Sequence, residues 1–391
     1  MPRVFDDLAC TDTSPQLYRE DTFAFLNRVS GLLWDRIRGE LELWYEAFPD
    51  ETGDVRARFR SRLPSQHFAA WWELYLHRLF SRLGFEIEVH PTVKGSTGRP
   101  DFTITRDGES LYVEAVMVES GIQEPGRHPL REAYVLDAIN QIKAPAFLLS
   151  VQFKSVGVQS APLRRLTDPI VAWLHRLAEN IDDLYEASNS GAEPQATEVA
   201  AGDWRLALRV IPLAPDQRNL PYHRLIGIGP ITTGRTDDEE RLGKALRRKR
   251  KRYGAPDRPL LVAALAVSGT MDDQSVAAAL YGAGTLSINL DTRETRYDRT
   301  PNGVWVGRRG LIGRRVSGVL MGHSLGMYSI GSVLPRLWHH PAPNHPVTTE
   351  FPFPTAHVVD DHLDYRDGTV TASDLLGIRV DWPGPEPPFP R

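Results

Sequence analysis

Apolar residues recur at helical spacing in two segments near the start of the chain. The first segment, residues 20–48, places Phe, Leu, Ile and Trp side chains along one face, and Pro49 ends it. The second covers about residues 65–83 and stops at Gly84, a residue type that readily follows the last turn of a helix. The spacing therefore predicts two N-terminal helical segments.

After the second helix the pattern shortens to strand-like runs at residues 85–90, 101–106 and 111–118. Asp107 and Gly108 lie between the last two runs, and this pair favours a tight hairpin turn. Both faces of the 111–118 run look apolar, so we expect this strand to be buried on both sides.

Helices and strands then alternate along the chain. The pattern predicts helices at 130–143, 164–187 and 236–253, and strands at 146–153, 204–213, 223–231, 259–267 and 316–321. The tail after about 340 is rich in Pro and His, and we expect it to be extended, lying on the surface or partly ordered. The order predicts an α/β fold whose core has a mixed β-sheet flanked by helices. We expect an N-terminal helical element at 1–64, the α/β core at 65–290, and a C-terminal extension with a Pro-rich tail at 291–391.

Composition limits the classes of protein that fit. The chain of 391 residues has a formal net charge of −4, so any surface for a polyanion must be local. Cys10 is its one cysteine, which excludes an intrachain disulfide and a zinc site built on several thiolates. No apolar run approaches the length of a membrane span, and the chain does not begin with a signal-peptide pattern. These features predict a cytoplasmic protein without a membrane partner.

Three acidic residues lie where an acid needs an explanation. Glu73 falls on the apolar side of its helix, and Glu114 falls in the middle of the buried strand. A buried carboxylate is costly without a partner such as an arginine or a metal ion. Asp101 follows Pro100 at the start of a strand. Each also has a simpler interpretation, with Glu73 paired to an arginine and Asp101 acting only as a turn residue.

The connections between these acids are short, so they can converge. A hairpin joins the strands that carry Asp101 and Glu114, and the helix that carries Glu73 leads into the preceding strand. Carboxylate oxygens without imidazole or thiolate are the ligands of hard cations, so the expected metal is Mg²⁺ or Mn²⁺. Such a site suits metal-assisted hydrolysis of a phosphodiester bond.

The stretch from Glu73 to Glu114 resembles the PD-(D/E)XK nuclease superfamily, in its order of a helix acid, Arg99-Pro-Asp-Phe and Tyr112-Val-Glu-Ala. The resemblance covers roughly residues 67–270. It implies a restriction-endonuclease-like core and an Mg²⁺-dependent nuclease that acts on nucleic acid, expected to be a DNA endonuclease in defence or DNA processing. One position departs from the family, because Val116 stands where its lysine usually follows the glutamate.

Another lysine must therefore supply that charge, or the site is inactive. The lysines of the chain are Lys94, Lys143, Lys154, Lys244, Lys249 and Lys251. Some branches of the family place Gln-x-x-x-Tyr on a helix before a core strand, and Lys249-Arg-Lys-Arg-Tyr253 resembles that setting. We therefore expect Lys249 to complete the catalytic set of Glu73, Asp101 and Glu114, with the three acids as metal ligands.

The helix predicted at 236–253 carries the one dense group of basic residues. Arg247, Arg248, Lys251 and Tyr253 are the residues that we expect to contact nucleic acid, through its phosphates. The alternative is purely structural, since acids follow a Thr236 cap at the start and basic residues crowd the end. That arrangement complements the helix dipole without any ligand.

Two other functions stay open. The first is a binding module of the same fold that has lost the chemistry, given Val116. The second is a serine hydrolase, because Gly322-His-Ser-Leu-Gly326 matches the Gly-x-Ser-x-Gly elbow with Ser324 as nucleophile. We interpret the histidines at 339, 340 and 345 as part of a surface loop. A homodimer or a partner protein also stays open, as does the choice between DNA and RNA.

Overall fold

The chain folds into two units, each with its own sheet. The structure, a computed structural model, describes residues 2–92, 98–118, 128–218, 224–228, 237–250, 256–267, 270–288, 292–293, 295–359 and 362–386. Unit 1 comprises Met1–Leu8, Leu32–Gly121 and Thr236–Glu386, and unit 2 comprises Ala9–Gly31, Ile122–Arg235 and Pro387–Arg391. Unit 2 is thus mainly an insertion into unit 1. This division differs from the expected boundaries after residues 64 and 290.

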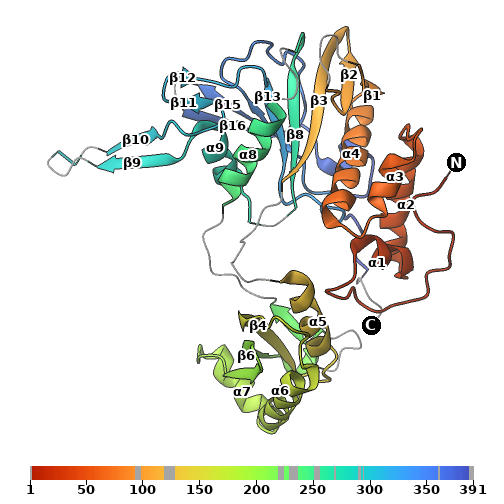
Figure 1. The fold of residues 1–391 in the computed structure, drawn as a ribbon, viewed down its shortest axis with the longest axis vertical. Helices are drawn as coiled ribbons and strands as arrows, with labels where there is room; N and C mark the ends of the chain where they lie inside the picture. Colours follow the sequence, from red (N-terminus) through yellow and green to blue (C-terminus); the bar gives the residue numbers. More distant parts are fainter. Residues whose placement is uncertain are drawn as a thin grey trace. The chain divides into compact units, whose positions relative to one another are not determined.

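The sheet of unit 1 is mixed and has eight strands (Figure 1). In sheet order they are β1 (Glu86–Val89), β2 (Phe102–Arg106), β3 (Glu109–Val118), β8 (Leu260–Ala266), β13 (Gly318–Gly322), β14 (Arg336–His339), β15 (Thr355–Val359) and β16 (His362–Arg366). The first three strands form an antiparallel meander. Strands β8 and β13 run parallel to β3, and β14 is antiparallel to β13. The predicted mixed sheet is therefore confirmed.

The hairpin between β2 and β3 forms as its sequence predicts. Asp107 and Gly108 have φ angles of 54° and 81°, and both lie in the left-handed region that this short turn requires. The register places Phe102 opposite Val113, which brings the start of β2 beside the middle of β3. This pairing carries Asp101 to the neighbourhood of Glu114.

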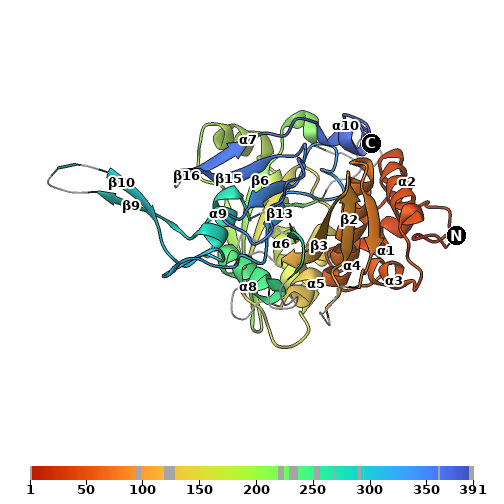
Figure 2. The ribbon, with the colours of Figure 1, turned by 90° about the horizontal axis from the view of Figure 1, so that it is seen from above.

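Some helices of unit 1 cover its sheet, and others lie beside the sheet (Figure 2). They are α2 (Leu32–Ala47), α3 (Asp54–Phe59), α4 (Pro64–Arg82), α8 (Asp238–Arg250), α9 (Asp273–Tyr281) and α10 (Ala372–Leu376). Pro64 opens α4, where a proline costs no helical hydrogen bond. The indole of Trp72 donates to the carbonyl of Ala263 in β8 at 2.9 Å, which ties α4 to the sheet. Leu242 and Leu246 of α8 pack with Val116 in one buried cluster.

The tail is more regular than its prolines suggest. The pattern predicts that residues after about 340 are extended, on the surface or partly ordered, and the structure places β15 and β16 at one end of the main sheet. The expected C-terminal extension also supplies β13, which pairs with the central strand β8. His339 lies in β14 and its ring stacks on that of His357 in β15, with centroids 4.0 Å apart. Short strands interrupted by prolines explain why the pattern underestimated this region.

Unit 2 has a four-stranded sheet with its own apolar core. Its strands are, in sheet order, β5 (Ala196–Ala201), β6 (Trp204–Pro212), β4 (Phe147–Ser155) and β7 (Ile226–Ile228). Its helices are α1 (Thr22–Arg28), α5 (Pro129–Asn140), α6 (Leu163–Ala178) and α7 (Ile181–Asn189). Side chains of α5 and α6 pack with alternate residues of β4 and β6 in a separate buried cluster. Unit 2 therefore does not depend on the unit 1 core for its apolar burial.

The remaining described elements are short. They are β9 (Gly284–Ile288) with β10 (Thr295–Arg299), β11 (Val306–Gly307) with β12 (Gly310–Leu311), and the 3-10 turn at Pro215–Gln217. None of the described helices is both long and apolar enough to cross a membrane.

Candidate active site

Glu114 lies at the centre of the acid cluster that the sequence predicts. It is fully buried in β3, on the same strand face as Tyr112 and Val116. The Lys249 ammonium donates a short hydrogen bond to Glu114 Oε1, and it also donates to the Ala115 carbonyl at 3.2 Å. This contact supplies the partner that a buried carboxylate requires.

Helical spacing explains how Lys249 reaches Glu114. Leu242 and Leu246 face β3, and Lys249 follows Leu242 by seven residues, so it continues the same face of α8. Val116 packs in the cluster beneath those leucines. A lysine of the helix packed over β3 therefore lies beside Glu114, while position 116 of the strand is a buried valine.

Asp101 joins the cluster through the backbone of β3. Its Oδ2 accepts a hydrogen bond from the Ala115 amide at 2.7 Å. Burial, and then the negative charges of Glu114 and Glu73, raise the pKa of Asp101 to about 7, although Lys249 and the Ala115 amide act in the opposite direction. Asp101 and Glu114 are thus close enough for each charge to affect the other.

Glu73 has an arginine partner, as its simpler interpretation predicts. Arg58 of α3 donates to both of its carboxylate oxygens, at 2.8 and 2.7 Å, and Arg58 also bonds Asp54 at 2.8 Å. Glu73 is 7% exposed. The two carboxylates hold the pKa of Arg58 above its ordinary value in spite of burial. Nothing in the sequence singles out Arg58, since an arginine on a short helix has no distinguishing signal.

The arrangement brings Glu73, Asp101, Glu114 and Lys249 into one electrostatic cluster. Among the described residues, no group of three or more His, Cys, Asp or Glu is placed to hold a metal ion. The oxygen atoms of the cluster are still of the kind that a hard cation prefers. Glu114 Oε1 and the Ala115 carbonyl oxygen both accept hydrogen bonds from one cationic group, the Lys249 ammonium. Asp101 is the second carboxylate beside them.

A basic cavity of about 500 Å³ lies along α8. Its lining residues are Ser65, Met117, Val118, Arg241, Lys244, Ala245 and Arg248. They come from the start of α4, the end of the Glu114 strand and one face of the Lys249 helix. Arg247 faces elsewhere and donates to the Asn302 carbonyl at 3.2 Å. Of the expected nucleic-acid contacts, Arg248 lines the cavity and Arg247 does not, while Lys251 and Tyr253 lie outside the described residues.

Ser324 occupies a tight turn directly after β13. Its φ of 55° is in the left-handed region, as in a strained elbow, and the residue is exposed. Its carbonyl accepts a hydrogen bond from the Ser329 hydroxyl at 2.8 Å, which holds the turn. Along the described residues that follow, the next helix is α10, so the helix of an elbow is missing.

The histidine of this motif serves a different contact. His323 Nε2 lies 2.8 Å from Asp273 Oδ1, and Arg336 lies 3.1 Å from the other oxygen of the same carboxylate. Within the described part of the chain, no hydrogen bond joins the Ser324 hydroxyl to a histidine. The turn therefore has the strained serine of a hydrolase elbow without its base.

Comparisons of the chain with protein-family models, curated proteins and solved structures find no match.

Proposed function

We propose that this protein hydrolyses phosphodiester bonds of nucleic acid with the help of Mg²⁺ or Mn²⁺. The observation that carries the proposal is the Lys249 ammonium on Glu114 and the Ala115 carbonyl, with Asp101 bonded to the same residue. The ammonium lies between two oxygen atoms of β3, Glu114 Oε1 and the Ala115 carbonyl oxygen. The same oxygen atoms are the kind that a hard divalent cation prefers.

The order of elements supports a restriction-endonuclease-like core. Helix α4 precedes the meander β1-β2-β3, and α8 then leads into β8, which is parallel to β3. This order agrees with the resemblance, in which a helix carries the first acid, adjacent strands carry the next two, and a second helix precedes a core strand. Unit 2 enters this order between β3 and α8.

In the proposed site, Asp101, Glu114 and the Ala115 carbonyl would hold the metal, with Glu73 at its edge. A bound divalent cation would lower the pKa of a coordinated water and offset charge on the phosphate. Lys249 would move away from Glu114 when the metal binds and would keep its positive charge beside the site, where it would stabilise the developing charge on the phosphate oxygens. Arg58 keeps Glu73 oriented toward this cluster.

The cavity beside the site supports a polyanion as substrate. Arg241, Lys244 and Arg248 project from one face of the helix that carries Lys249. Phosphate contacts of this type are independent of base sequence and weaken with salt. A nucleic-acid strand lying along α8 would pass the end of β3 and bring a phosphate near Glu114.

An inactive binding module of the same fold is the second candidate. It is favoured by the two ion pairs, Arg58 with Glu73 and Lys249 with Glu114, which already satisfy the buried charges. In that case the cations would stay in place and no metal would enter.

One assay separates the two candidates. Labelled plasmid DNA, linear DNA and RNA are incubated with the purified protein in Mg²⁺, Mn²⁺ or EDTA, beside Glu114→Gln and Ser324→Ala. Metal-dependent cleavage that Glu114→Gln loses and Ser324→Ala retains supports the nuclease. Binding without cleavage in any metal would instead assign the inactive module.

A further inference from the structure

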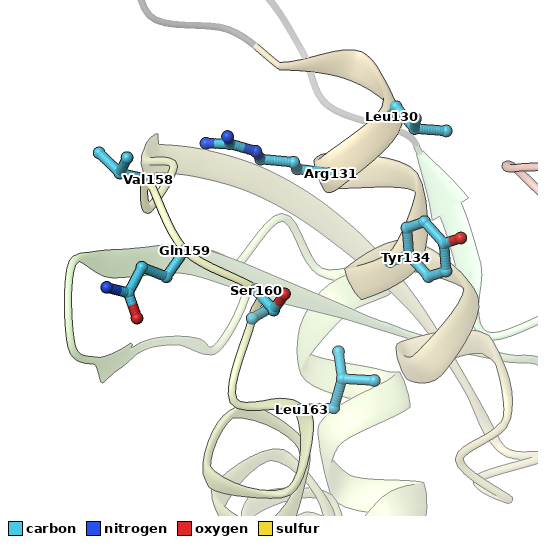
Figure 3. A pocket seen from close by; sticks show the side chains of 8 residues that line it. Leu130, Arg131, Tyr134, Val158, Gln159, Ser160 and Leu163 are labelled. Carbon is cyan, nitrogen blue, oxygen red and sulfur yellow. The ribbon is translucent and has the colours of Figure 1, made fainter.

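Unit 2 contains a cavity of about 760 Å³ that the proposed chemistry does not use (Figure 3). Its lining residues are Leu130, Arg131, Tyr134, Val158, Gln159, Ser160, Ala161 and Leu163. Figure 3 shows the α5 side chains on one side, the loop that follows β4 on the other, and Leu163 at the start of α6. A volume of this size is typical of sites that bind a small molecule or one group of a larger ligand.

The loop on one side of this cavity is held in place. Arg131 donates to the Gly157 carbonyl at 3.0 Å, and the Trp204 indole donates to the Gln159 carbonyl at 3.3 Å. A Cβ at position 157 would lie 2.3 Å from the Trp204 indole nitrogen, so only glycine fits there. These contacts hold the backbone of the loop on this side of the pocket.

Large apolar side chains are exposed around the pocket. Val158 is 73% exposed, Leu130 66% and Tyr134 47%. Exposed apolar groups gathered around one hollow mark a binding surface, whereas scattered ones need no explanation. The Arg19 guanidinium lies over the Tyr134 ring, 5.1 Å from its centroid, and this cation–π contact fixes the ring while leaving it half exposed.

Basic side chains lie in the pocket and directly after one of its lining residues in the chain. Arg131 lines it, and Arg164 and Arg165 follow Leu163 as exposed residues of α6. The neighbouring acids of α5 serve internal contacts: Glu132 accepts from the His128 amide at 3.2 Å, and Asp137 accepts from the Tyr18 amide at 2.7 Å. Asp168, one turn further along α6, is an exposed acid and offsets part of this charge.

We propose that this pocket binds an unpaired nucleobase of a nucleic-acid strand, with Tyr134 as the stacking surface and the arginines on the flanking phosphates. An aromatic face bordered by arginines is what a base and its backbone require. The inference rests on the proposed function, because it makes unit 2 the part that recognises the strand that unit 1 cleaves. It also gives a reason for an insertion between the Glu114 strand and the Lys249 helix.

Binding is tested on the full chain in EDTA, where no cleavage occurs. The probe is a fluorescein-labelled single-stranded oligonucleotide, followed by anisotropy, for wild type, Tyr134→Ala, Tyr134→Phe and Tyr185→Ala. Tyr185, on α7, is the matched control. We expect Tyr134→Ala to weaken binding roughly tenfold, because stacking on one aromatic side chain contributes about 1–3 kcal/mol per base. Tyr134→Phe and Tyr185→Ala should bind like wild type.

A second readout reports on the base itself. A 2-aminopurine in the oligonucleotide should change its fluorescence on binding to wild type and not to Tyr134→Ala. Wild-type affinity in Tyr134→Ala would overturn the inference, and so would an equal loss with a fully paired duplex. Thermal unfolding checks that each variant is folded. Failure of metal-dependent cleavage leaves these binding results unchanged, so the two proposals can fail separately.

Discussion

The acid cluster and the Ser324 turn are two candidate sites on one sheet, and they are built in opposite ways. Glu73, Asp101, Glu114 and Lys249 come from four elements, and their charges meet in a buried space. Ser324 comes from one contiguous motif, is exposed, and lies in a turn held by its own neighbours. A short motif therefore says less about chemistry than residues that converge from distant parts of the chain.

Replacing one residue in each site should give the largest difference in the free energy of unfolding. Lys249→Met leaves the fully buried Glu114 carboxylate without its ammonium, and breaking a buried pair in this way costs about 3–5 kcal/mol. Ser324→Ala, at an exposed position, should change the free energy of unfolding by less than about 0.5 kcal/mol. Urea unfolding measures both.

A third variant sharpens this result. The double variant Glu114→Gln/Lys249→Met has no buried charge. Its loss of stability should therefore be smaller than the sum of the losses in the two single variants. Additive losses would mean that Lys249 and Glu114 do not interact.

The Arg58–Glu73 pair should show a smaller but clear effect. Arg58→Met leaves Glu73 buried and unpaired, and we expect a loss of about 3 kcal/mol. Arg60→Met is the matched control in the same region, because Arg60 pairs with the exposed Asp6 and such pairs contribute only about 0–1 kcal/mol. Equal losses in the two variants would show that Arg58 has no special role at the cluster.

The two neighbouring arginines of α8 should differ in nucleic-acid binding. Arg248→Ala removes a side chain of the basic cavity, so the slope of log affinity against log salt should fall by about 1. Arg247→Ala should leave that slope unchanged, because Arg247 bonds the Asn302 carbonyl. Anisotropy titrations at several salt concentrations measure the slope, and the reverse order would place the strand on the other side of the helix.

Asp101 should give the protein a modest pH dependence. Its folded-state pKa of about 7 is above its ordinary value of 3.8, so the folded state binds the proton more tightly than the unfolded state. The resulting stability is fully present below about pH 4 and is lost as pH rises through 7. Metal binding needs the carboxylate, so metal affinity should rise over the same interval.

Asp101→Asn tests this assignment. The variant should lose that part of the pH dependence of stability between about pH 4 and 7, measured by chemical unfolding at several pH values. An unchanged pH profile in the variant would assign the titration to another group.

The sequence predicts the local part of this site well. The hairpin follows from the turn residues Asp107 and Gly108, and the buried position of Glu114 follows from the apolar pattern of its strand, whereas Lys249 was expected beside the acids from a resemblance to a family motif. Such patterns report which face of an element a residue occupies. They are sufficient here because β2, β3 and α8 pack directly on one another.

Long-range packing could not be predicted in the same way. Arg58 reaches Glu73 from a separate short helix, and β15 and β16 join the sheet from a region whose prolines suggest an extended tail. The sequence pattern also does not reveal that unit 2 has a core of its own, because its helices and strands have the same periodicity as those of unit 1. Spacing identifies elements, but it does not say which elements share a core.

The most direct test of the central claim is anomalous diffraction from crystals soaked in Mn²⁺. We predict a peak between the carboxylates of Asp101 and Glu114 and the Ala115 carbonyl, with the Lys249 ammonium moved away from Glu114. A map in which Lys249 still bonds Glu114, with no peak at these oxygen atoms at saturating Mn²⁺, would contradict the account.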